Sequence, residues 1–226
     1  MCGRYVITSH AEAIRRLFDT TNPPVNFAAN WNVAPTQDVL AVRFNPESRA
    51  SALDKLRWGL IPIWATDKSI GAKLINARGE TLAEKPSFRD AFNKRRCLIP
   101  ADAFYEWRKT ASGKQAYAVA LAARAPMAFA GLWERWKDPA AGGEIVRSCA
   151  IVTTAANALL APIHERMPVI VPPEGWKLWL GEADGDPAAL VKPFPAELME
   201  AWPISARVNS VKNNDAALLA PAAVTA

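Results

Sequence analysis

Residues 97–121 read CLIPADAFYEWRKTASGKQAYAVAL, and this stretch decides the fold class that the sequence predicts. It contains three short apolar runs separated by polar residues, and two more such runs follow before residue 155. Runs of this length and composition are typical of strands. The five predicted strands are Cys97–Ile99, Phe104–Arg108, Ala116–Leu121, Met127–Trp133 and Ile145–Thr154.

The helices around these strands are expected to be short. Ser9–Glu12 has the pattern of a capping box, which predicts a helix start. Pro173 and Glu174 predict a second helix start, and Pro195–Trp202 is interpreted as a further short helix. Asn32–Pro35 is interpreted as a loop.

Strict alternation of strands and helices is absent, which argues against a doubly wound parallel sheet. We therefore predict one α+β domain over residues 1–213, with a mixed, largely antiparallel and barrel-like sheet and short peripheral helices. The Ala-rich residues 214–226 are expected to form a flexible C-terminal tail.

Composition narrows the class of protein. Half of the 226 residues are hydrophobic, so a sizeable core can form, but no apolar run approaches the ~20 residues of a membrane span. No signal peptide is evident, and the three widely spaced cysteines predict neither a disulfide framework nor a zinc site. A cytoplasmic protein without metal or cofactor is expected. The net charge of +5 and nine tryptophans favour a polyanionic partner with bases to stack on.

Cys2 directly follows Met1. Because a Cys side chain is small, removal of Met1 is expected, and this would leave a free amine and a thiol on adjacent carbons. The amine can condense with an aldehyde and the thiol can then close a thiazolidine ring; alternatively, the thiolate can act as a nucleophile with the amine as base. Both groups are expected to be partly reactive at neutral pH. The other interpretation is an incidental Cys at a frayed terminus.

Two polar clusters interrupt otherwise apolar surroundings. Asn76–Thr81 follows an apolar pair, and Glu106 lies between aromatic residues inside a predicted strand. If that strand is central, Glu106 is buried or lines a cleft, where a carboxyl group is a candidate general acid or base. If the strand is half-exposed, Glu106 simply faces solvent.

His164 is one of two histidines and lies within a third polar cluster, Ile163–Val169. Histidine suits proton transfer near neutral pH, although a single histidine is more often structural. Arg4, Arg78 and Arg166 each lie beside a candidate reactive group, and a guanidinium offers a rigid fork for phosphate oxygens.

Taken together, these segments resemble the SRAP family, the SOS-response-associated peptidases or abasic-site-processing proteins. The matching motifs occur in order along the chain from residue 1 to about residue 213. They are Met1–Tyr5, Asn32–Pro35, Arg57–Pro62 with Trp64, Asn76–Arg78 with Glu80–Thr81, Arg95–Asp102 with Phe104–Trp107, Thr153–Asn157, Ile163–Pro168, and Val208–Asn209 with Lys212–Asn213.

The resemblance implies the SRAP fold, a function in DNA damage and the SOS response, and catalytic roles for four residues. Cys2 matches a nucleophile that forms a thiazolidine crosslink with the aldehyde of an abasic deoxyribose. Asn76 matches a residue that holds the amine and the sugar, Glu106 matches one that opens the sugar ring and moves protons, and His164 matches one that acts on a sugar hydroxyl. The enzyme class implied is hydrolase, peptidase or lyase.

The resemblance also implies a channel for single-stranded DNA, and we expect the protein to be nucleoid-associated when it acts on DNA. A monomer is expected, because one lesion needs one site. The implied DNA-binding residues are Arg4, Trp64, Arg78, Thr153, Arg166 and Lys212. Trp64 matches a tryptophan that wedges beside unstacked bases. Some family members carry a second Trp just after it, whereas this chain has Ala65, which puts the strength of base stacking in doubt.

Two other functions are open from the sequence. The chain could be an N-terminal-nucleophile amidohydrolase of the glutaminase type, in which the Cys2 thiolate attacks an amide. It could also be a module that binds single-stranded DNA without chemistry, in which Cys2 is incidental. Glutaminase and crosslinking assays distinguish these functions.

Overall fold

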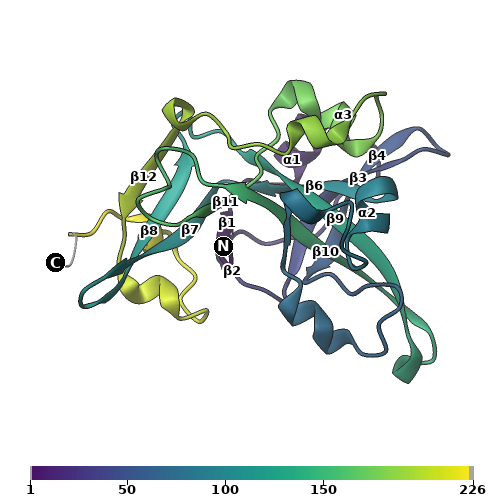
Figure 1. Cartoon of the computed structure of the whole chain (residues 1–226), viewed down its shortest axis with the longest axis horizontal. Helices are drawn as coiled ribbons and strands as arrows, with labels where there is room; N and C mark the ends of the chain where they lie inside the picture. Colours follow the sequence, from purple (N-terminus) through teal and green to yellow (C-terminus); the bar gives the residue numbers. More distant parts are fainter. Residues whose placement is uncertain (1, 224–226) are drawn as a thin grey trace.

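The apolar runs predicted as strands pair along the chain into two β-sheets in the computed structural model, which describes residues 2–223 (Figure 1). The smaller sheet has five strands, and all of its pairings are antiparallel. In spatial order the strands are β12 (Met199–Pro203), β8 (Gly113–Leu121), β7 (Ala103–Thr110), β1 (Tyr5–Ile7) and β2 (Asn30–Val33).

The larger sheet contains a closed ring of strands. The ring runs β10, β4, β3, β6 and β9 and returns to β10, because β9 pairs with both β6 and β10. Only the β4–β10 and β5–β10 pairings are parallel. The strands are β3 (Asp38–Asn45), β4 (Ala50–Trp58), β5 (Asn76–Arg78), β6 (Arg96–Ala101), β9 (Met127–Asp138), β10 (Glu144–Ala155) and β11 (Arg166–Pro168). The predicted mixed, largely antiparallel, barrel-like α+β fold is confirmed.

The five-stranded sheet is covered on both faces. Because side chains alternate along a strand, neighbouring residues of β7 enter different cores. Phe104 belongs to the main core and packs edge-on against Phe129 of the barrel, whereas Tyr105 belongs to a smaller core with Val208 from the C-terminal segment. Full burial of one such aromatic side chain stabilises the fold by about 1.5–3 kcal/mol. β1 joins the two sheets, since Tyr5 also contacts Phe129 edge-on.

The helices are short and lie outside the strands, as predicted. They are α1 (Ala11–Leu17), α2 (Arg89–Lys94) and α3 (Trp176–Leu180), and α1 and α3 lie together at one edge of the molecule in Figure 1. Trp179 of α3 is fully buried and donates a hydrogen bond from Nε1 to the carbonyl of Cys97 at 2.8 Å. In residues 2–223 no helix is long and apolar enough to cross a membrane.

Three local predictions were wrong. The N-cap of α1 is His10, whose Nδ1 accepts from the Glu12 amide, because Ser9 instead bonds Asp102. In Pro195–Trp202 only Ala196–Leu198 form a short 3-10 helix, whereas the second half of the segment belongs to strand β12, because the edge of β8 offers backbone partners that outweigh a weak helix signal. Asn32 lies in strand β2 rather than in a loop.

The segment expected to form a flexible tail carries packed residues up to the end of the described chain. Leu218 is fully buried in the smaller core, and Trp202 donates from Nε1 to the carbonyl of Leu219 at 2.8 Å. Residues 224–226 of the expected tail lie outside the described residues.

Candidate functional site

Cys2 lies at the start of the segment that leads into β1. The β1–β7 pairing places Tyr5 opposite Phe104, and the Tyr105 amide donates to the Arg4 carbonyl at 3.0 Å, which continues this register toward Cys2. In that antiparallel register Gly3 comes opposite Glu106. Both Cys2 and Glu106 are buried, with exposed fractions of 0% and 2%. The alternative that Glu106 faces solvent is therefore excluded.

The Cys2 thiol is less acidic than expected. Burial raises the pKa of this thiol well above its ordinary value, and the nearby carboxylate of Glu106 raises it further. The expectation of a partly ionised thiol assumed a solvated chain end without residue 1, whereas burial opposes ionisation of the thiol in the chain that includes residue 1. In this site sulfur is held as the neutral thiol, and a base must take its proton when it reacts.

Asn76 connects a third element to Cys2. It opens β5, and its Nδ2 donates a hydrogen bond to the Cys2 carbonyl at 2.9 Å. The Oδ1 atom of Asn76 is buried and accepts no hydrogen bond from the described residues. The pairing of β5 with β10, in which Asn76 lies opposite Ile151, fixes this position. Three predicted catalytic residues, far apart in sequence, therefore meet here.

His164 lies two residues before β11, which pairs with the end of β10. Its Nδ1 accepts a hydrogen bond from the Arg166 amide at 3.0 Å, so in neutral His164 the ring proton is on Nε2. We call Cys2, Asn76 and Glu106 the Cys2 cluster. Strand β10 connects His164 to this cluster, because β5 and β11 both pair with Thr153 of β10.

Arg166 and Thr153, both predicted to bind DNA, form an internal network instead of an open surface. Arg166 makes a two-point ion pair with Glu80 at 2.7 and 2.9 Å, and its Nη2 also donates to the Thr153 carbonyl at 2.7 Å. The Arg166 side chain is 12% exposed and Thr153 is fully buried. A phosphate at Arg166 would therefore have to displace Glu80.

The other predicted DNA-binding residues differ in exposure. Arg78 and Lys212 are exposed, and Trp64 is 55% exposed. Arg4 is half-buried, and its Nη1 donates to Oδ1 of Asn32 at 2.8 Å and to the Val208 carbonyl at 2.9 Å. Burial lowers the pKa of the Arg4 guanidinium, although it stays charged at neutral pH.

The sequence analysis missed Ile63, which is 63% exposed beside Trp64. The Ala65 amide donates to the Pro62 carbonyl at 2.9 Å, so Ile63 and Trp64 occupy the two central positions of a tight turn. Trp136 fixes this turn by donating from Nε1 to the Ala65 carbonyl at 2.6 Å. The signal available in the sequence was two bulky apolar residues enclosed by a proline and an alanine.

The loop that carries this turn also leads to Asn76 of the Cys2 cluster. The loop leaves β4 after Trp58 and re-enters the sheet at Asn76, and its base is closed by a Leu60 amide to Leu74 carbonyl bond at 3.1 Å. Trp58 adds a bond from Nε1 to the Ile75 carbonyl at 2.9 Å. These bonds hold the exposed pair Ile63–Trp64 in a fixed position relative to Asn76.

Two other possible sites have no link to this chemistry. A hollow of about 480 Å³ lies around Phe18 and Trp176 and is lined by none of the predicted site residues. Within residues 2–223 there is no group of three or more His, Cys, Asp or Glu residues placed to hold a metal ion.

The chain belongs to the SRAP family. Residues 1–211 match the family described as SOS response associated peptidase (SRAP). The chain is 44% identical to the abasic site processing protein YoqW of Bacillus subtilis, with 97% of this chain and 99% of the relative covered, and 31% identical to YedK of Escherichia coli, with 98% and 100% covered. It is also similar to a crystal structure of a protein from Bacteroides thetaiotaomicron, at a TM-score of 0.87 and 26% identity over 98% of this chain and 100% of that chain.

Proposed function

We propose that this protein processes abasic sites in single-stranded DNA by forming a thiazolidine crosslink between Cys2 and the ring-opened sugar. The observation that carries the proposal is the bond from Asn76 to the Cys2 carbonyl beside buried Glu106. Relatives over the full length of the chain are named abasic site processing proteins, which supports the same substrate.

The first step requires the open-chain aldehyde, because an abasic sugar is mostly a closed hemiacetal. Glu106 takes the proton of the C1′ hydroxyl and returns a proton to the ring oxygen, which opens the ring. The free amine of Cys2 then attacks the aldehyde carbon, and loss of one water gives an imine. Oδ1 of Asn76, which accepts from none of the described residues, is assigned to accept from the amine or from a sugar hydroxyl.

The second step closes the ring. The neutral Cys2 thiol adds across the imine: a bond forms between sulfur and C1′, and the thiol proton passes through Glu106 to the nitrogen. The net change from aldehyde to thiazolidine is the loss of one water. Removal of the imine blocks β-elimination, so the DNA strand stays intact. His164, with its proton on Nε2, is assigned to donate to a sugar hydroxyl.

The proposal requires removal of Met1, because an acylated nitrogen cannot form the imine. Residue 1 lies outside the described residues, so its removal is itself part of the proposal. Cys2 is fully buried, so access of the sugar to Cys2 is a second requirement of the proposal. Intact-mass measurement of the purified protein tests the removal of Met1.

The decisive experiment uses single-stranded DNA with one abasic site and a denaturing gel. We expect a heat-stable shifted band whose mass equals protein plus DNA minus one water. The band should be absent for Cys2→Ala and for a variant with an additional residue that blocks Met1 removal. Absence of the band from the wild type would refute crosslinking, and glutamine hydrolysis that depends on Cys2 would favour an amidohydrolase.

A further inference from the structure

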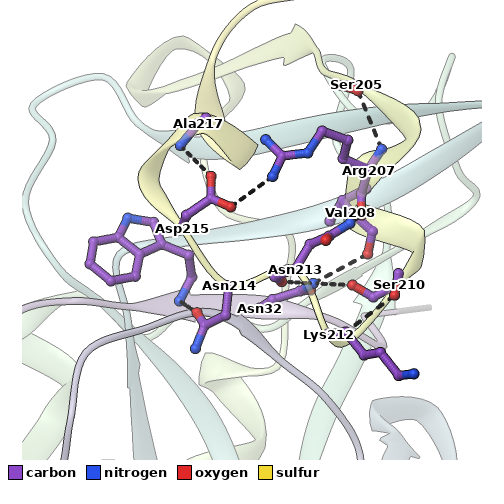
Figure 2. A network of polar contacts seen from close by, with 11 residues as sticks. Asn32, Ser205, Arg207, Val208, Ser210, Lys212, Asn213, Asn214, Asp215 and Ala217 are labelled. Atoms are coloured by element: carbon purple, nitrogen blue, oxygen red, sulfur yellow. Dashed lines mark hydrogen bonds and ion pairs between the residues drawn. The ribbon is translucent and has the colours of Figure 1, made fainter.

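Two motifs of the sequence that have no role in the chemistry above meet in one network of hydrogen bonds, which Figure 2 shows. Asn32 of β2 is 1% exposed, and its Nδ2 faces three backbone carbonyls of the segment Val208–Asn213. The distances are 3.4 Å to Val208, 3.0 Å to Ser210 and 2.7 Å to Asn213. One buried amide therefore shapes a loop almost two hundred residues away in sequence.

The loop has further bonds that fix its shape. The Arg207 carbonyl accepts from Nδ2 of Asn213 at 2.7 Å, and the Arg207 guanidinium pairs with Asp215 at 2.8 Å. Asn214 accepts from the Trp31 amide of β2 at 2.7 Å. Lys212 is exposed, and its side chain points away from the network in Figure 2. The network thus holds the backbone of Lys212, whose ammonium group has no ion-pair partner among residues 2–223.

The carboxamide oxygen of Asn32 accepts a hydrogen bond from Arg4. Oδ1 of Asn32 accepts from Nη1 of Arg4 at 2.8 Å, and the same Nη1 donates to the Val208 carbonyl at 2.9 Å. Both hydrogens of Nη1 are used in these bonds. Nε of Arg4 is buried and donates to none of the described residues. Arg4 is two residues from Cys2, and its carbonyl is bonded to the strand that carries Glu106.

We propose that Asn32 and Arg4 form a positioning clasp, in which Asn32 fixes the loop that presents Lys212 and Arg4 fixes the chain end that carries Cys2. Arg4 acts in this clasp rather than as a phosphate ligand. The inference rests on the proposed crosslinking function and adds to it the groups that place the nucleophile and one DNA contact relative to each other.

The two arms of the clasp can be separated by substitution. Asn32→Asp keeps the shape and the acceptor for Arg4 but replaces the Nδ2 hydrogens by an oxygen that faces three carbonyls, so only the loop is released. Arg4→Met keeps the length of the side chain and removes its donors, so the chain end is released together with one bond to the Val208 carbonyl, while the bonds from Asn32 to the loop remain. Dissociation constants are measured with single-stranded DNA that carries a stable abasic analogue without an aldehyde, and crosslinking rates at saturating abasic DNA.

We expect Asn32→Asp to raise the dissociation constant roughly tenfold and to leave the crosslinking rate at saturation within about twofold. We expect the reverse for Arg4→Met, with the rate lowered roughly tenfold and the dissociation constant nearly unchanged. A purely structural role would change both quantities together with the thermal midpoint. This separation of binding from rate is therefore the signature of positioning.

Asn22→Asp is the matched control. Nδ2 of Asn22 donates to the Leu53 carbonyl at 2.8 Å, so the same substitution removes the same kind of bond. Both side-chain hydrogen bonds of Asn22 are made to Leu53 of β4. The control should lose some stability while binding and crosslinking stay at wild-type values.

Two outcomes would overturn the inference. If Arg4→Met weakens binding, lowers its salt dependence and leaves the rate intact, Arg4 is a phosphate ligand. If Asn32→Asp matches the Asn22→Asp control in binding and rate, Asn32 does not position the loop. Should Asn32→Asp fail to fold, Asn214→Ala, which removes an exposed bond of the same loop, takes its place with the same expected binding defect.

Hydrogen exchange tests the clasp separately from the chemistry. In Asn32→Asp the amides of residues 207–215 should exchange faster, while the amides of residues 4 and 5 keep their protection. Unchanged exchange in residues 207–215 contradicts the clasp even if the wild type crosslinks. A wild type that does not crosslink, but whose loop loosens in the variant, refutes the proposed function and leaves the clasp intact.

Discussion

The exposed turn of Ile63 and Trp64 gives a prediction for DNA binding. We expect these two side chains to insert beside unstacked bases next to the lesion, because two hydrogen bonds hold the turn and both side chains are mostly exposed, at 63% and 55%. Ile63 would supply the second apolar surface that Ala65 lacks. The changes to make are Ile63→Ser and Trp64→Ala.

The magnitudes follow from the exposed surface. Full burial of an isoleucine side chain is worth about 1.5–3 kcal/mol, and the 63% still exposed leaves about 1–2 kcal/mol for contact with bases. That predicts roughly a 5- to 30-fold rise in the dissociation constant for Ile63→Ser. One base stacked on an aromatic ring is worth about 1–3 kcal/mol, so Trp64→Ala should raise it roughly 5- to 150-fold.

The assay is fluorescence anisotropy with labelled single-stranded DNA that carries the stable abasic analogue. Leu198→Ser is the matched control, because Leu198 is also exposed, at 52%, but is not part of the turn. The loss for Ile63→Ser should persist at high salt, since it removes an apolar contact rather than an ion pair. Wild-type affinity in both turn variants, or an equal loss in Leu198→Ser, would refute the reasoning.

Three further predictions concern charge and protonation. Glu106→Gln should slow crosslinking by roughly 100-fold or more while DNA affinity stays within a few-fold, because the amide cannot relay protons; equal losses of rate and affinity would mean a structural role. Arg78→Ala, which removes an exposed cation, should lower the slope of log affinity against log salt by about 0.7 for one phosphate contact, and an unchanged slope would exclude that contact. Raising the pH from about 8 to about 9.5 should destabilise the fold, because burial raises the pKa of Cys2, Cys97 and Cys149. The stability that the three protonated thiols provide is present below the unfolded pKa of about 8.5 and is lost above it, by up to about 1.4 kcal/mol for each thiol per pH unit. Urea denaturation at both pH values measures this loss, and a midpoint that does not fall would contradict it.

Much of the fold was predictable because strand signals are local. The runs around Phe104 and Val119 have the length and composition of strands, and their pairing in β7 and β8 follows from a short connection. The strand β12 was not predictable, because its residues 199–203 become a strand only by pairing with the free edge of β8. Asn32 was predicted to lie in a loop, because its strand is only four residues long and gives a weak local signal.

The candidate site was predictable in its chemistry but not in its geometry. Glu106 was identified because a carboxyl group among aromatic residues is unusual, and it proved to be buried. The ion pair of Arg166 with Glu80 was not foreseen, because it joins residues 86 positions apart, one in β11 and the other in the short 3-10 helix that follows β5. Ile63 was missed because a turn tip and a core residue look alike in sequence.

The functional groups of the candidate site can be read from the sequence. A Cys directly after Met1, together with Asn76, Glu106 and His164 in their motifs, defines which functional groups are available, because the covalent chemistry of a side chain does not depend on the fold. Their protonation and their hydrogen-bond partners depend on the tertiary structure. The Cys2 thiol is neutral because the fold removes it from water and places a carboxylate beside it, and Arg4 is committed to Asn32 because β2 and the Val208–Asn213 loop meet there. Burial and long-range pairing set protonation and exposure, and neither is written in any local stretch of sequence.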